Sequence, residues 1–126
     1  MHTSQGIQFI ERHADEPFFL YQSYYAPHER HDPPKEFLAH YEGEEDAGYY
    51  ASVSNLDWNV GRLLDALREN NILDETLIII TTEHGMTRIE RAGTTVGMCI
   101  PYDEAARIPL IIRYPKLLPQ GKVWQS

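Results

Sequence analysis

The chain has 126 residues, with 11 Lys and Arg against 19 Asp and Glu, which gives a formal net charge of −8. This length allows one domain, and 42% hydrophobic residues are enough to supply a buried core. The acidic balance argues against a nucleic-acid partner, because such binding relies on Lys and Arg to neutralise phosphates. The longest apolar runs fall far short of the roughly 18 to 20 residues that cross a bilayer, so no membrane span is predicted.

The first part of the chain predicts a helix, a strand and a proline-rich loop. Apolar residues at helical spacing predict a helix over residues 4–14. The aromatic and apolar run PFFLYQSYY, residues 17–25, favours β structure and predicts a buried strand. The run APHERHDPP, residues 26–34, contains three prolines and therefore predicts an ordered or extended loop.

The rest of the chain predicts two more helices and two more strands. Pro34 fits the first turn of a helix over residues 35–41. A long apolar stripe predicts a helix of about six turns, with Asp46 as its N-cap and Asn70-Asn71 as its C-terminal stop. The β-branched run over residues 76–82 is typical of a strand covered on both faces. The run over residues 108–113 predicts a further strand, which Pro109 restricts to an edge or a start.

The alternation of strand, helix and strand predicts an α/β fold with a mainly parallel sheet flanked by helices. In such sheets ligands collect beyond the carboxyl ends of the strands. Glu83 and His84 follow the strand over residues 76–82, and a carboxylate beside an imidazole is able to bind a divalent cation. The alternative is a solvated acidic residue beside a capping histidine, and the spacing alone leaves both interpretations open.

Four other residues are candidates for a catalytic or binding role: His28, His31, Asp32 and Cys99. His28, between Pro27 and Glu29, has the position to donate a proton to a leaving group or a hydrogen bond to a developing anion, although a lone histidine in a loop is more often structural or merely exposed. His31 and Asp32 share this loop with less support, and each is also consistent with a structural or merely exposed role. Cys99 has no base or cation nearby in the sequence that would lower its pKa, so it is interpreted as a small buried hydrophobic residue.

Three separated blocks of the chain carry a family resemblance. They are FIERHADEPFFLYQSYYAPHERHDPP, then YYASVSNLDWNVGRLLDALRENNILDETLIIITTEHG, then YDEAARIPLIIRYPKLLPQGK. In order and in spacing they resemble the later half of the catalytic domain of the sulfatases, within the alkaline phosphatase superfamily. The resemblance implies an α/β sandwich that cleaves the sulfate ester of a small molecule or a glycan.

The resemblance also implies a cofactor and a mechanism. In such enzymes a formylglycine, made from a Cys or a Ser, is hydrated and attacks sulfur, and a divalent metal, usually calcium, holds the sulfate and the nucleophile. Lys and His side chains neutralise the transferring group and help the leaving alcohol to depart. Carried over by position, Glu83 and His84 fall on the family's metal-binding pair, and His28 falls on the histidine of its Pro-His loop.

Two positions, Glu83 and Met98, depart from the family pattern. Glu83 stands where the family usually has Asp and is one methylene longer, so it is still able to bind a cation but from a backbone set slightly farther away. Met98 stands where the family usually has a Lys, and a methionine does not neutralise a sulfate. Cys99 lies in a Cys-x-Pro sequence without the following Arg of the nucleophile motif, and that motif belongs near the start of the family's domain. Cys99 is therefore not expected to be the nucleophile, and the formylglycine is expected upstream of this chain.

These departures leave three hypotheses. In the first, residues 1–126 are part of a sulfatase catalytic domain without its nucleophile segment and smaller C-terminal domain, and are inactive alone. In the second, the chain belongs to a metal-dependent phosphonate or phosphodiester hydrolase of the same superfamily. In the third, the scaffold persists as a non-catalytic interaction domain.

Overall fold

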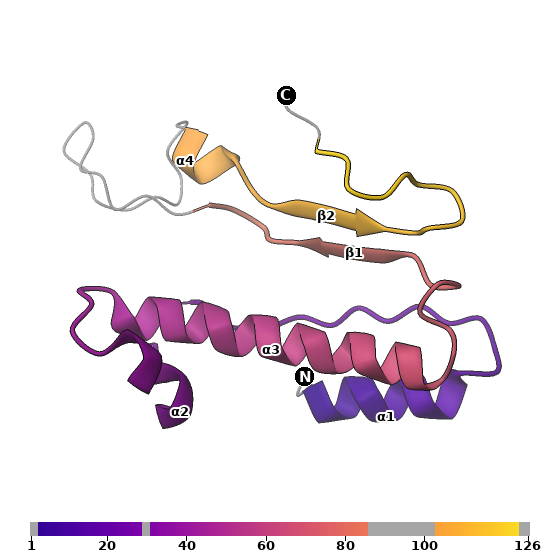
Figure 1. Ribbon diagram of the computed structural model, residues 1–126, viewed down its shortest axis with the longest axis horizontal. Helices are drawn as coiled ribbons and strands as arrows, with labels where there is room; N and C mark the ends of the chain where they lie inside the picture. Colours follow the sequence, from indigo (N-terminus) through magenta and orange to yellow (C-terminus); the bar gives the residue numbers. More distant parts are fainter. Residues whose placement is uncertain (1–2, 29–30, 86–102, 124–126) are drawn as a thin grey trace. The chain divides into compact units, whose positions relative to one another are not determined.

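The computed structural model describes residues 3–28, 31–85 and 103–123 of the chain. The chain divides into two compact units, Met1–Leu73 and Asp74–Ser126. The first unit is helical, and the second contains the strands (Figure 1). No helix among the described residues is long and apolar enough to cross a membrane. The α/β character predicted from the sequence is confirmed.

The first unit is organised around one long helix. This helix, α3 (Ala47–Glu69), packs against α1 (Thr3–His13) and against α2 (Lys35–Leu38), which continues into the 3-10 helix η1 (Ala39–Tyr41). All three predicted helices are therefore present. The fully or almost fully buried apolar side chains come from α1 and α3: Ile10, Ala51, Ala66 and Leu67.

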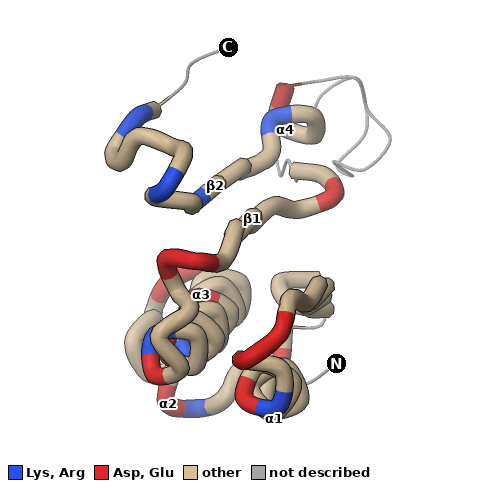
Figure 2. The backbone as a smooth tube through the Cα atoms, turned by 90° about the vertical axis from the view of Figure 1, so that its right-hand side faces the viewer, with Lys and Arg blue, Asp and Glu red and all other residues tan. Residues whose placement is uncertain are grey.

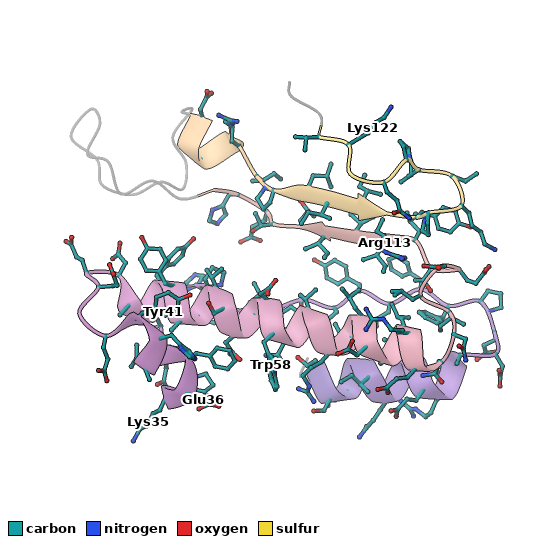
Figure 3. The ribbon with its side chains drawn as sticks, in the orientation of Figure 1. Lys35, Glu36, Tyr41, Trp58, Arg113 and Lys122 are labelled. Carbon is teal, nitrogen blue, oxygen red and sulfur yellow. The ribbon has the colours of Figure 1, made fainter. Side chains whose placement is uncertain are left out.

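Aromatic and polar contacts join the shorter helical segments to α3. The ring of Trp58 in α3 lies 5.9 Å from that of Phe37 in α2, measured between centroids, and the Arg62 guanidinium lies 4.9 Å from the Trp58 ring (Figure 3). The hydroxyl groups of Tyr41 and Ser54 are 2.6 Å apart, which joins η1 to α3. The contacts of Phe37 and Tyr41 hold α2 and η1 against the first half of α3.

The ends of α3 follow the sequence signals in position, although not in every contact. Asp46 occupies the N-cap position, but its side chain makes no capping hydrogen bond. At the other end Asn70 Nδ2 donates to Ala66 O at 2.8 Å, and Asn71 has a positive φ of 59°. Asn tolerates this left-handed backbone better than most residues, which explains why the helix stops there.

The segment after α1 differs from its prediction. Residues 17–25 run as an extended chain but form no strand in the part of the chain that the structure describes. Exposure alternates from residue to residue, so that Gln22 and Tyr24 face the helices while Tyr21 and Tyr25 face outward. A strand needs a hydrogen-bonded neighbour, and the described strands belong to the other unit, so the β-favouring run stays extended and half exposed rather than buried.

The second unit is a two-stranded sheet. Strand β1 (Ile78–Thr81) pairs with β2 (Leu110–Arg113), with Ile79 opposite Ile112, and α4 (Asp103–Ala106) precedes β2 (Figure 1). The pair is antiparallel, whereas the sequence predicted mainly parallel strands. The reason is local: β2 starts at the end of the sheet where β1 stops, so the chain returns beside β1 in the opposite direction.

One face of this sheet is apolar and open. Ile79 and Ile112 share that face because they are directly opposed, and they are 57% and 48% exposed. The predicted coverage of both strand faces is therefore absent here. Acidic residues precede β1, and basic residues follow along β2 and the segment after it (Figure 2). Arg113 Nη2 lies 2.5 Å from Asp74 Oδ1, and Lys116 forms an ion pair with Glu75. These two ion pairs join the segment before β1 to the end of β2 and the segment after it.

Candidate active site

The loop after β1 begins where the strand ladder is interrupted. Thr81 is the last paired residue of β1 and lies opposite Leu110, so Pro109 is the residue before the pair. Proline has no N–H to donate, which ends the ladder at this point. The Thr81 hydroxyl donates instead to the Pro109 carbonyl at 2.9 Å. The chain is thereby released from the sheet just before Glu83 and His84.

A single backbone hydrogen bond fixes the far end of this loop. The Gly85 N–H donates to the Ala105 carbonyl in α4 at 2.8 Å. The segment between Thr81 and Gly85 is therefore held at both ends, by the ladder on one side and by α4 on the other. Residues held at both ends lose less conformational freedom when they bind a ligand.

The imidazole of His84 is oriented by its own loop. Its Nδ1 lies 2.7 Å from the Gly85 carbonyl, and a carbonyl oxygen only accepts, so Nδ1 carries the proton and donates. In the neutral ring this leaves the lone pair on Nε2. Nε2 lies 3.4 Å from Glu83 Oε1. The structure thus brings the two predicted residues together and leaves one nitrogen and one carboxylate side by side.

This donor set fits a divalent cation as part of its ligands. A backbone carbonyl that fixes one ring nitrogen while the other faces a ligand is the usual arrangement of metal-binding histidines. Two donors of one cation lie roughly 3 Å apart when they meet it at about a right angle, close to the 3.4 Å between Nε2 and Oε1. Within the described residues no group of three or more His, Cys, Asp or Glu side chains gathers for a metal.

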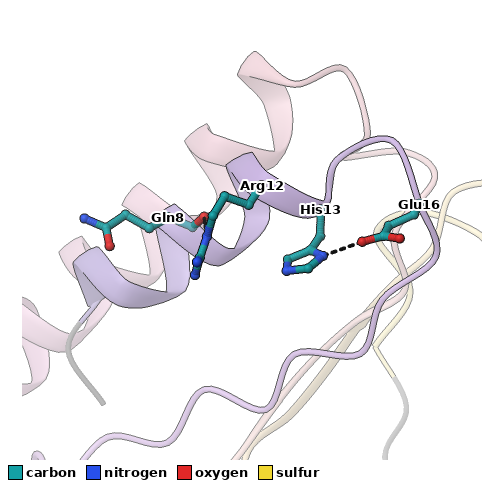
Figure 4. A network of polar contacts seen from close by, with 4 residues as sticks. All are labelled: Gln8, Arg12, His13 and Glu16. Carbon is teal, nitrogen blue, oxygen red and sulfur yellow. Dashed lines mark hydrogen bonds and ion pairs between the residues drawn. The ribbon is translucent and has the colours of Figure 1, made fainter.

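Another histidine and glutamate pair in the chain shows a different arrangement. At the end of α1, His13 Nδ1 lies 2.5 Å from Glu16 Oε1, within a turn that also joins the Glu16 N–H to the His13 carbonyl (Figure 4). In His13 the partner of Nδ1 is this carboxylate, whereas in His84 the partner of Nδ1 is the Gly85 carbonyl. The contact of His13 with Glu16 lies at the end of α1. In the other pair the His84 Nε2 lies beside the Glu83 carboxylate, and the Glu83 side chain is 83% exposed.

His28 lies in the first unit, in a tight reversal of the chain. The peptide bond between Ala26 and Pro27 is cis, and the His28 N–H donates to the Tyr25 carbonyl at 2.9 Å. These two features together describe a type VI turn. The ring of His28 lies 4.6 Å from that of Tyr25, with 30° between their planes. His28 as a whole residue is exposed.

The remaining sequence candidates differ in their surroundings. His31 packs against the start of α3: its ring lies 5.6 Å from that of Tyr49, and a Cβ on Gly48 would come within 3.2 Å of His31 Cβ. His31 is therefore a packing residue, while Asp32 is exposed. Met98 and Cys99 lie outside the described residues. Sequence reasoning missed Tyr25, although its place directly before the Ala-Pro-His run was a usable signal.

Comparison with known proteins gives the family. A model of the sulfatase family, described as "Sulfatase", matches residues 3–126 of the chain. The chain belongs to the sulfatase family. Steryl-sulfatase of Mus musculus is 33% identical over an alignment of 133 positions, which covers 96% of this chain and 21% of that protein. Arylsulfatase of Clostridium perfringens is 27% identical over an alignment of 158 positions, gaps included, which covers 95% of this chain and 32% of that protein.

Solved structures agree with this sulfatase assignment. The crystal structure of Ps i-CgsB superposes with a TM-score of 0.82 at 27% identity, over 94% of this chain and 28% of that one. The same protein in complex with k-i-k-neocarrahexaose gives a TM-score of 0.79. The alkaline phosphatase-like fold expected from the sequence is thereby confirmed. This sulfatase chain spans between 21% and 32% of the length of the two relatives described above.

Proposed function

We propose that this chain contributes proton-donating and metal-binding residues to a hydrolase of sulfate esters. The observation that carries the reaction class is the family match over residues 3–126. The oriented imidazole of His84 beside the Glu83 carboxylate supports the binding of a divalent cation. When bound, such a cation neutralises the sulfate oxygens and lowers the barrier to transfer.

Each chain residue has a defined task in this proposal. Glu83 supplies a carboxylate oxygen, and His84 supplies Nε2 while the Gly85 carbonyl holds Nδ1–H. Calcium prefers six to eight oxygen ligands, so a calcium site would draw most of its ligands from other residues. The proposal assigns the nucleophile to a hydrated formylglycine and to none of the described residues of this chain. His28 donates a proton to the leaving oxygen as the S–O bond breaks, and that oxygen keeps the bonding electron pair.

The substrate in this proposal is a sulfated carbohydrate or a small sulfate ester. Two comparisons support the carbohydrate: the complex of Ps i-CgsB with a neocarrahexaose, and N-acetylgalactosamine-6-O-sulfatase of Bacteroides thetaiotaomicron, which is 28% identical over 95% of this chain. The exposed positions of Glu83 and His28 suit substrates that approach from solvent.

The test uses the protein at its full natural length. Bound metal is measured by mass spectrometry after dialysis, and sulfate release is measured on an aryl sulfate and on a sulfated galactosamine. We expect Glu83→Gln and His84→Ala to lower both the metal content and the turnover. The matched controls are Glu16→Gln and His13→Ala, which alter the other histidine and glutamate pair and should leave both quantities unchanged.

The outcomes separate the three hypotheses. Turnover of a phosphodiester or a phosphonate ester in preference to the sulfate ester would replace the proposal by the second hypothesis. Full metal content in both variants of the pair would remove the metal-binding role. A wild-type protein that turns over none of these esters would favour the interaction domain.

A further inference from the structure

Tyr25 lies against His28 in the turn that carries this histidine. Their ring centroids are 4.6 Å apart and their planes differ by 30°. The hydrogen bond from the His28 N–H to the Tyr25 carbonyl, 2.9 Å long, closes the chain between them. The turn therefore places the imidazole against an aromatic ring, in a residue that is exposed as a whole.

Tyr25 differs from the tyrosine that precedes it. Tyr24 faces inward, and its hydroxyl lies 3.1 Å from Thr3 Oγ1 at the start of α1, which anchors the extended segment. Tyr25 faces outward and is 75% exposed. A ring this exposed adds little to a hydrophobic core, because its stabilisation scales with the apolar area removed from water. Its described ring contact is with His28.

We propose that Tyr25 is a positioning residue that holds the imidazole of His28 in the orientation from which it protonates the leaving oxygen. The inference rests on the proposed function, in which His28 is the proton donor. Aromatic pairs in near-parallel or edge contact favour their geometry by roughly 2- to 12-fold in population. Removal of the Tyr25 ring therefore takes away one restraint on the His28 rotamer, which reduces the fraction of molecules ready to donate the proton.

A proton donor matters most when the leaving alcohol is a poor leaving group. A nitrophenolate departs readily without a proton, whereas an alkoxide does not. A misplaced His28 should therefore slow alkyl sulfates much more than nitrophenyl sulfate. This selective loss distinguishes a positioning role from a structural one, because partial unfolding would reduce the turnover of every substrate by the same factor.

The test measures kcat and KM of the full-length protein on nitrophenyl sulfate, phenyl sulfate and an alkyl sulfate. We expect Tyr25→Leu to lower kcat on the alkyl sulfate by roughly 2- to 12-fold, with less than about a twofold change on nitrophenyl sulfate and in KM. A second variant without the ring, Tyr25→Gln, should give the same pattern. Tyr25→Phe should retain kcat because it keeps the ring. Tyr21→Leu is the matched control, since Tyr21 is 77% exposed on the same face of the segment.

The variant His28→Ala separates this inference from the proposed function. If His28→Ala reduces all substrates equally or has no effect, His28 is not the proton donor, and both proposals are wrong. If His28→Ala selectively slows the alkyl sulfate but Tyr25→Leu and Tyr25→Gln do not, only the role of Tyr25 is refuted. In the double variant His28→Ala, Tyr25→Leu we expect no loss beyond that of His28→Ala; additive losses would also overturn the positioning role.

Discussion

Two helix glycines in the first unit provide a direct test of how α1 is packed. Gly6 lies in α1 and Gly61 in α3. A Cβ built on Gly6 would come within 2.5 Å of Gln22 Oε1 and 3.0 Å of Leu63 Cδ2, whereas a Cβ on Gly61 meets nothing within 4 Å. The two positions therefore offer the same substitution, Gly→Ala, with and without a steric obstacle.

The expected free energies follow from this difference. In a helix interior Ala is about 0.8 to 1.0 kcal/mol more favourable than Gly, so Gly61→Ala should raise the free energy of unfolding by about 1 kcal/mol. Gly6→Ala has the same gain, but the ends of the Gln22 and Leu63 side chains must move aside. Because both are the ends of flexible side chains, the cost lies at the low end of the overpacking range, about 1 kcal/mol. The net expectation for Gly6→Ala is therefore a change of about 0 kcal/mol, which places the two variants about 1 kcal/mol apart.

The assay is urea unfolding of the full-length protein, followed by circular dichroism, with the slope m checked for constancy across variants. A third variant identifies the obstacle. Gln22→Ala removes the atom at 2.5 Å, so it should recover part of the steric cost in the Gly6→Ala background, with a coupling of about 0.5 to 1 kcal/mol. Equal stabilisation by Gly6→Ala and Gly61→Ala would show that α1 does not pack closely at Gly6, and the reasoning would then be wrong.

Two further predictions concern the second unit. Thr81→Val removes the hydroxyl that donates to Pro109 O, and we expect it to lower the free energy of unfolding by about 0.5 to 1.5 kcal/mol; the neighbouring Thr82→Val is the control in the same urea assay. The hydrogen bond with Glu75 raises the pKa of Lys116 above its usual 10.5. Because the folded state holds this proton more tightly, the stabilisation is fully present below pH 10.5 and is lost as the pH rises through the raised pKa. Glu75→Gln should lower the pKa of Lys116 in an NMR titration of its side chain, and an unchanged pKa would contradict this cause.

The parts of the fold that the sequence predicted well are those with local physical causes. The end of α3 at Asn71 is one example: its φ of 59° is left-handed, and Asn tolerates this conformation better than most residues wherever it stands in a fold. Pro109 lies just before β2, as expected of a residue without an N–H. The helices over 3–13 and 47–69 follow from apolar spacing, which is set within a few turns of chain. The pairing of Glu83 with His84 is likewise local, since they are neighbours.

The parts that the sequence did not predict depend on what lies beside a segment. Residues 17–25 favour β structure, but strand formation requires a neighbour that composition does not reveal. The direction of the pair β1 and β2 depends on where the chain returns, which the bond from Gly85 to Ala105 shows. The capping bond expected from Asp46 is absent, although the residue stands at the right position. The contact of Tyr25 with His28 needed the geometry of the turn.

In both units a candidate histidine lies just beyond a β-favouring segment at a position set by backbone contacts. In the first unit the His28 N–H is bound to the Tyr25 carbonyl. In the second, the ladder stops at Thr81, and the Gly85 N–H is bound to Ala105, with His84 between these two fixed points. Backbone hydrogen bonds constrain the main chain whatever the side chains are, so each ring starts from a defined Cα position and only its side-chain torsions stay free.

A neighbour of each ring then restricts those torsions, the Gly85 carbonyl for His84 and the Tyr25 ring for His28. The two neighbours differ in kind: the carbonyl selects which nitrogen carries the proton, whereas the aromatic ring contacts the face of the imidazole and selects neither nitrogen. The first suits a metal ligand, which must present a lone pair from one fixed nitrogen. The second suits a proton donor, which must give up its proton and regain it in each turnover.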